Sequence, residues 1–118
     1  MFKENISIKN YNSFQIDVKT KLFSEFKNIE ELKIILNSSL YKINKSTILG
    51  GGSNILFTND YEGLILKNNI TGIKIIKENN DNIIVEVGSG ENWHKFVMWS
   101  IEKNLSGIEN LALIPGSV

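Results

Sequence analysis

The sequence predicts an α+β fold built from two parts. Before residue 50, a strand-like run, an amphipathic helix and a second strand-like run follow one another, which is the order of a small α/β unit. After residue 63, two strand-like runs flank a polar turn, as in an antiparallel hairpin, and a second amphipathic helix follows. We expect the two parts to meet near residues 60–67.

The first part begins with the β-prone run Lys19 to Phe26, which predicts a strand. Asn28 is a suitable N-cap for the following helix, because Glu31 completes a capping-box-like pair three residues later. The polar segment Asn37-Ser38-Ser39 ends this helix. Thr47 to Leu49 forms a short strand that leads into a glycine-rich loop. Four apolar residues fall on one face of the helix: Ile29, Leu32, Ile35 and Leu36.

The second part follows a short buried strand, Leu64 to Leu66. Ile73 to Lys77 and Ile83 to Val87 read as the two strands of the hairpin. A helix is predicted from Trp93 to about Asn104, with Gly107 placed to finish it. Its apolar face has regular helical spacing and consists of Trp93, Phe96, Val97, Ser100 and Ile101.

The stretch Leu49 to Phe57, Leu-Gly-Gly-Gly-Ser-Asn-Ile-Leu-Phe, carries the strongest functional signal. Glycine adopts positive φ at little cost, so consecutive backbone N–H groups can turn toward an anion and form a nest. We therefore expect a phosphate or pyrophosphate here, although a tight turn without a ligand is an open alternative. The candidate ligands are Gly50, Gly51, Gly52, Ser53 and Asn54.

Two familiar phosphate loops are excluded. A P-loop ends in Gly-Lys-Ser/Thr, whereas no lysine follows these glycines. The dinucleotide fingerprint G-x-G-x-x-G needs a third glycine, and that position holds Ile55 when counted from Gly50, or Trp93 when counted from Gly88. The loop is thus a cradle of another kind.

Composition restricts the class of protein. The 13 basic and 13 acidic side chains balance, which argues against a general affinity for nucleic acid or anionic membrane. No apolar run is long enough to span a membrane, and the N-terminus lacks a signal-peptide core. There is no cysteine, so we expect no disulfide, and the cytoplasm is the simplest location. All basic residues are lysine, so the chain offers no arginine clamp for phosphate.

Four motifs in this order resemble the UDP-N-acetylenolpyruvylglucosamine reductase (MurB) family of peptidoglycan synthesis. Besides the glycine loop, they are Asn12-Ser13-Phe14 with Ile16-Asp17, the run Val87 to Trp93, and the run Gly107 to Val118. The resemblance covers residues 10–118. Gln15 departs from the family, which usually has glycine at that position. The family pattern continues beyond Val118, so we expect the N-terminal portion of a longer enzyme.

The resemblance implies a two-subdomain FAD-binding fold of the vanillyl-alcohol-oxidase/PCMH type. Residues 1–66 would form the first subdomain, and residues 67–118 the start of an incomplete second one. FAD would bind non-covalently between them, with its pyrophosphate on the glycine loop. A second loop that contacts the flavin is implied at Ile114, Pro115, Gly116 and Ser117.

The family reaction implies NADPH as the reductant of FAD and UDP-N-acetylglucosamine enolpyruvate as the substrate, which is reduced to UDP-N-acetylmuramate. The family's proton donor and its arginine and glutamate have no counterpart in residues 1–118, so we expect no catalytic residue here and no activity from this chain alone. The UDP-sugar would bind through the missing C-terminal part of a cytoplasmic monomer. Another FAD oxidoreductase of the same fold, a non-catalytic flavin- or nucleotide-binding module, and a non-functional remnant of the reductase are the alternatives.

The remaining candidates have structural interpretations. His94, the only histidine, has no metal-ligand partners and is expected to be a solvated surface residue. Trp93 and Trp99 could stack on a flavin, but helix packing is the preferred role for Trp93. Glu91 and Asn92 are expected to cap the helix rather than to bind a ligand.

Overall fold

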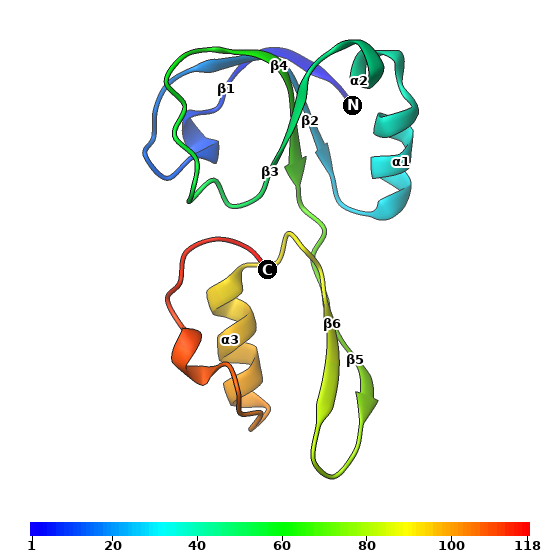
Figure 1. Ribbon diagram of the computed structural model, residues 1–118, viewed down its shortest axis with the longest axis vertical. Coiled ribbons are helices and arrows are strands. Elements are labelled where there is room, and N and C mark those ends of the chain that lie inside the picture. The colour runs from blue at the N-terminus through cyan, green and yellow to red at the C-terminus, as the bar shows by residue number, and fades with distance from the viewer.

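The computed structural model describes residues 1–118 and shows two lobes joined by a narrow waist (Figure 1). Residues 1–68 form the N-terminal lobe, and residues 69–118 form the C-terminal lobe. The expected boundary after residue 66 falls inside the last strand of the first lobe, because Lys67 and Asn68 still pair with neighbouring strands. The C-terminus lies at the waist, beside the first lobe (Figure 1). No helix has the length and apolar character needed to cross a membrane.

The N-terminal lobe contains a four-stranded sheet in the order β1-β2-β4-β3. The last three strands run parallel, as a strand–helix–strand order requires, and β1 pairs antiparallel with β2. The strands predicted at β2 and β3 are confirmed, and the strand predicted at residues 64–66 is the centre of β4. The bounds are β1 Lys3–Ser7, β2 Lys19–Phe26, β3 Ser46–Leu49 and β4 Tyr61–Asn68.

Helices α1 (Ile29–Asn37) and α2 (Ser39–Ile43) connect β2 to β3. The predicted N-cap is confirmed, since the Asn28 side chain accepts the Glu31 N–H at 2.8 Å. The Glu31 carboxylate reaches back to the N–H of Lys27, at 2.7 Å, which is one residue earlier than a capping box requires. The sequence did not predict α2, because Ser38 both ends α1 and caps the next helix.

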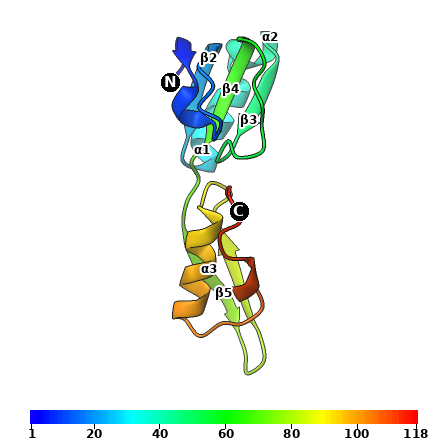
Figure 2. The ribbon, with the colours of Figure 1, turned by 90° about the vertical axis from the view of Figure 1, so that its left-hand side faces the viewer.

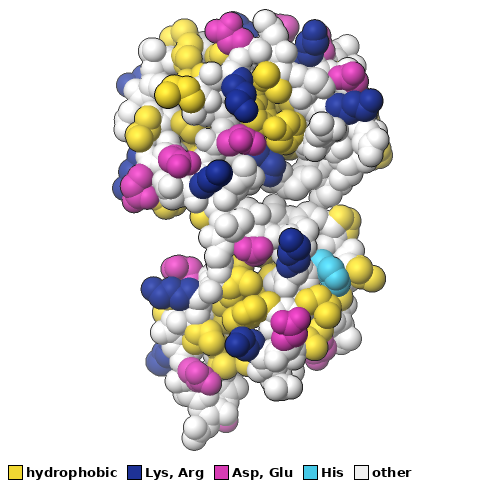
Figure 3. Space-filling model, turned by 180° about the vertical axis from the view of Figure 1, so that it is seen from behind, with side chains coloured by type: hydrophobic (Ala, Val, Ile, Leu, Met, Phe, Trp, Pro, Cys, Tyr) yellow, Lys and Arg dark blue, Asp and Glu magenta, His cyan; other side chains and the backbone are white.

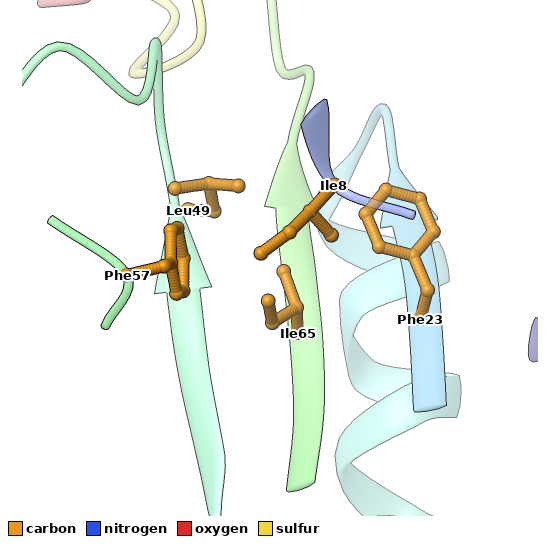
Figure 4. Packing of buried hydrophobic residues seen from close by; sticks show 5 residues of the cluster. All are labelled: Ile8, Phe23, Leu49, Phe57 and Ile65. Atoms are coloured by element: carbon orange, nitrogen blue, oxygen red, sulfur yellow. The ribbon is translucent and has the colours of Figure 1, made fainter. Parts of the chain in front are cut away.

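The sheet has an apolar core on each face. On one face, Ile35 of α1 packs over Leu22, Phe26, Leu64 and Leu66, which explains why both helices lie on that side (Figure 2). The opposite face is covered by loops rather than helices. There, the sheet residues Phe23, Leu49 and Ile65 pack with Ile8 and Phe57 from two loop segments (Figure 4).

The C-terminal lobe consists of the predicted hairpin, β5 (Ile73–Glu78) with β6 (Ile83–Val87), and α3 (Trp93–Glu102). The expectation that Gly107 finishes α3 is wrong. Asn104 takes the left-handed position, with φ of 57°, and Leu105 N–H donates to the Ser100 carbonyl at 2.9 Å. This is a Schellman motif, in which asparagine replaces the usual glycine because its short polar side chain tolerates positive φ.

Candidate phosphate-binding pocket between two loops

A pocket of about 440 Å³ opens where the glycine loop meets the last residues of the chain. Residues 48–55 leave the carboxyl end of β3 and line one side, while Pro115, Gly116 and Ser117 line the other. Eight of the nine predicted site residues therefore lie around one cavity, and only Ile114 is not in its lining. The carboxyl ends of parallel strands are the usual location of ligand sites in such sheets.

The glycine loop is anchored at both ends in the core of the N-terminal lobe. Leu49, just before the loop, is 3% exposed, and Phe57, just after it, is 8% exposed. Both side chains belong to the cluster on the helix-free face (Figure 4). The loop itself has no side-chain bulk to bury until Ile55, so its course is set by these two anchors and by its backbone.

Gly52 is the residue at which the loop needs glycine most. Its φ is +69°, and a Cβ atom placed on it would overlap the carbonyl oxygen of Tyr11. The Gly52 carbonyl accepts the N–H of Ser13 at 3.0 Å. The loop is thus pressed directly against the backbone of residues 11–13, where a side chain cannot fit.

The turn at residues 12–16 supports this contact. Asn12 is 5% exposed, and its amide donates to the carbonyls of Ile8 (2.8 Å) and Ile16 (3.1 Å) while its oxygen accepts the Ile16 N–H (3.0 Å). Gln15 adopts φ of +53°. The turn therefore keeps the left-handed backbone that glycine would favour, even though glutamine occupies the position.

The two loops approach each other so closely that a side chain added to either one would crowd the other. A Cβ on Gly50 would lie 2.7 Å from Ser117 Oγ, and one on Gly51 would lie 3.1 Å from Gly116 Cα. Gly116 itself has φ of +118°, and its added Cβ would meet Ser53 Oγ at 3.0 Å. Four of the eleven residues that line the cavity are glycines, so part of its wall is bare backbone.

These walls present unpaired donors. The backbone N–H groups of residues 50–54 make no hydrogen bond within the chain, and neither do those of Gly116 and Ser117.

None of the lining residues is charged. Lys67 lies opposite Leu49 in the sheet but outside the pocket lining, and its ammonium donates to the Asn68 carbonyl at 3.2 Å. Burial lowers the pKa of Lys67, and Glu25 partly offsets this. Any positive potential in the pocket therefore comes from backbone dipoles.

The second loop is fastened to the first turn of α3. Trp93 N–H donates to the Gly116 carbonyl at 3.1 Å, and Val118 N–H donates to the Glu91 carbonyl at 3.0 Å. The Trp93 indole donates to the Leu111 carbonyl at 2.8 Å, so Trp93 holds the loop as well as packing against Phe96.

Several sequence expectations about this region can now be judged. Asn92 caps α3, as expected, by accepting the Lys95 N–H at 3.0 Å, whereas the Glu91 carboxylate accepts the Gly72 N–H within the C-terminal lobe. His94 was expected to be a solvated surface residue, and it keeps a partly exposed side chain that also makes a hydrogen bond. His94 is half-buried, and its Nδ1 accepts the N–H of Leu113 at 3.2 Å. No local pattern predicts this bond, because the two residues are 19 positions apart. No group of three His, Cys, Asp or Glu side chains is placed to hold a metal ion.

Comparison with known proteins identifies relatives of the chain. The FAD binding domain family matches residues 20–118. UDP-N-acetylenolpyruvoylglucosamine reductases from Flavobacterium johnsoniae and Amoebophilus asiaticus are 47% and 46% identical to it, over 116 and 117 residues. Each alignment covers 98% of this chain but 34% of the relative, so the chain spans about a third of the length of the curated relatives it matches.

A solved structure supports the fold. The crystal structure of UDP-N-acetylenolpyruvylglucosamine reductase (MurB) from Thermus caldophilus superposes with a TM-score of 0.72 at 20% sequence identity, covering 100% of this chain and 40% of that one. The predicted α+β FAD-binding fold is thereby confirmed. The chain belongs to the FAD binding domain family, and within it matches the UDP-N-acetylenolpyruvoylglucosamine reductases over about a third of their length.

Proposed function

We propose that the pocket between the two loops binds the pyrophosphate of FAD. The observation that carries the proposal is the set of seven unpaired backbone N–H groups, from residues 50–54, Gly116 and Ser117, around one cavity. A pyrophosphate needs several donors at close range, and the glycines at positions 50–52 and 116 lack Cβ atoms, which lets the backbone approach it there. The residues present therefore fit the phosphate part of the cofactor.

The remainder of FAD would lie along the waist. The two lobes that meet there would be the two parts of one FAD-binding unit. Ile114 and Pro115 follow Leu113 as exposed residues of the second loop, and the resemblance to the family assigns them to contact with the flavin. When bound, FAD supplies hydride transfer, and the chain's own contribution is to bind and orient it. No cysteine is present and His94 is engaged with Leu113, which favours non-covalent binding.

For the full-length protein we propose the reaction that its relatives' name describes, the reduction of UDP-N-acetylenolpyruvoylglucosamine. The support is the 46–47% identity to two such reductases, together with the resemblance of the glycine loop and the Pro115-Gly116 segment. The proposal includes NADPH as the electron source, a UDP-sugar as substrate, and a cytoplasmic monomer. We assign no residue of this chain to proton transfer.

Two measurements test the proposal at the level of the whole protein. Purified full-length protein should be yellow and should release flavin on acid or heat denaturation. It should also turn over NADPH continuously only when the enolpyruvyl substrate is added, because without substrate the bound FAD can accept hydride from a single equivalent of NADPH. A colourless protein that cannot be reconstituted with FAD would refute the cofactor assignment. Bound FAD without turnover of this substrate would favour a different oxidoreductase or a binding module.

The pocket itself is tested by Gly51→Val. Because Gly116 Cα would lie 3.1 Å from the first added carbon, the larger side chain should displace the second loop and obstruct the cavity. We expect FAD to bind more than about tenfold more weakly, which corresponds to about 1.4 kcal/mol. Thr58→Val, an exposed site just beyond the loop, is the control and should keep the parent affinity. Equal FAD dissociation constants for folded Gly51→Val and the parent would exclude this pocket as the pyrophosphate site.

A further inference from the structure

The segment Ala112–Pro115 is held by very little. Leu113 is 79% exposed, and Ile114 and Pro115 are also exposed, so no buried side chain anchors the backbone here. The hydrogen bond from Leu113 N–H to His94 Nδ1 is the only one that residues 112–115 make within the chain. The residues that follow directly, Gly116 and Ser117, form one wall of the pocket.

The conformation at Leu113 makes this bond more important. Leu113 has φ of +65°, in the left-handed region that side chains other than glycine and asparagine rarely adopt. Such a conformation persists only where surrounding contacts enforce it. With the side chain in solvent, the enforcing contacts are the His94 bond at 3.2 Å and the fastening of the flanking residues to Trp93.

The bond also defines the state of the histidine ring. Nδ1 can accept the Leu113 N–H only when it carries no proton, so the bond requires the tautomer with its proton on Nε2. An imidazolium has no free acceptor and would release the loop. His94 is fixed on α3, one residue after Trp93, so the helix supplies both side chains that hold the segment from Leu111 to Leu113.

We propose that His94 is a positioning residue for FAD. Through Nδ1 it fixes the strained turn at Leu113, and the turn sets the course of the chain into Gly116 and Ser117 opposite the glycine loop. The proposal rests on the proposed function, because it presumes that the pocket holds the cofactor. His94 does not line the pocket, so it acts through the Leu113 backbone.

The test compares two nearly isosteric variants of the full-length protein, His94→Leu and His94→Asn. The asparagine Oδ1 occupies the position of Nδ1 and can accept the Leu113 N–H, whereas leucine cannot. Lys95→Leu and Lys95→Asn, at the neighbouring exposed position, control for helix propensity. Two readouts are taken on protein shown to be folded by circular dichroism: hydrogen exchange of the Leu113 amide without FAD, and the FAD dissociation constant from titration of flavin fluorescence.

We expect His94→Leu to speed exchange of the Leu113 amide and to weaken FAD binding, each by about three- to tenfold, which is the effect of losing one ordinary hydrogen bond. His94→Asn should keep most of the parent's protection of the Leu113 amide and most of its FAD affinity. Both Lys95 variants should match the parent. Unchanged FAD affinity in His94→Leu, or equal losses in the leucine and asparagine variants, would overturn the proposal while leaving FAD binding by the parent intact. A parent that binds no FAD would instead refute the proposed function, and this inference with it.

Discussion

The two lobes of this chain are built in different ways. Almost every buried side chain lies in the N-terminal lobe, and Val97 is the only buried hydrophobic residue of the C-terminal lobe. Figure 3 shows hydrophobic side chains on one face of the lower lobe, and large apolar side chains of the hairpin, α3 and the last loop remain exposed. They are Ile75, Ile76, Ile84, Met98, Ile101, Leu111, Leu113 and Ile114.

This difference extends to the two walls of the candidate pocket. The glycine loop is held between Leu49 and Phe57, which are part of a packed core. The opposite wall is held by hydrogen bonds with Trp93 and His94 and by a strained turn. One wall is therefore fixed by burial, and the other by a few directional contacts. Substitutions of the same type should have unequal effects in the two lobes.

The largest difference is expected for a pair of phenylalanines. Phe23 is completely buried in the N-terminal lobe, so Phe23→Ala should lower the free energy of unfolding by about 3–5 kcal/mol. Phe96 is half-buried on α3, between Trp93 and Trp99, so Phe96→Ala should cost less than about 1.5 kcal/mol. Urea titration followed by circular dichroism measures both. Equal losses would show that the C-terminal lobe has a core of comparable strength.

A second comparison uses two glycines with positive φ. Gly52→Ala combines left-handed strain with overlap against the Tyr11 carbonyl, so it should cost roughly 3 kcal/mol. Gly72 has φ of +119° but open space around it, so Gly72→Ala should cost only about 1–2 kcal/mol from strain. The same urea titration distinguishes them. A cost at Gly72 as large as that at Gly52 would mean that φ alone, and not the close approach of residues 11–13, requires glycine in the loop.

The sequence predicted those elements whose signals are local. The Asn28 cap, the β2 run and the alternating hairpin strands depend on neighbouring residues, and the structure confirms them. Strand β1 was missed because Lys3–Ser7 is polar and stays exposed, so its pairing with β2 leaves no hydrophobic pattern. The end of α3 was misplaced because asparagine can replace glycine in a Schellman motif.

For the same reason, only part of the candidate site could be predicted from the sequence. The glycine run is a local signal and the Pro115-Gly116 loop was implied by the resemblance to the family, and the structure brings the two loops together around one cavity. The contacts that hold them are between residues distant in sequence. Ser13 with Gly52, Trp93 with Leu111, and His94 with Leu113 follow from tertiary packing, which no spacing rule predicts.

The smallest effects should come from the left-handed residues Gln15 and Asn104, one in each lobe. Gln15 has φ of +53° and an exposed side chain, so Gln15→Gly relieves a strain of about 1–2 kcal/mol. Glycine also makes the unfolded chain more flexible, at a cost of about 0.5–1 kcal/mol. The net gain in unfolding free energy should be about 0.5 kcal/mol.

At Asn104, φ of 57° costs less, because asparagine adopts this region readily. Asn104→Gly should therefore be neutral within about 0.5 kcal/mol, since the two contributions cancel. Thermal and urea unfolding of both variants against the parent measure this difference. If the free energy of unfolding rises more in Asn104→Gly than in Gln15→Gly, the backbone strain is greater in the loosely packed C-terminal lobe than in the turn at residues 12–16.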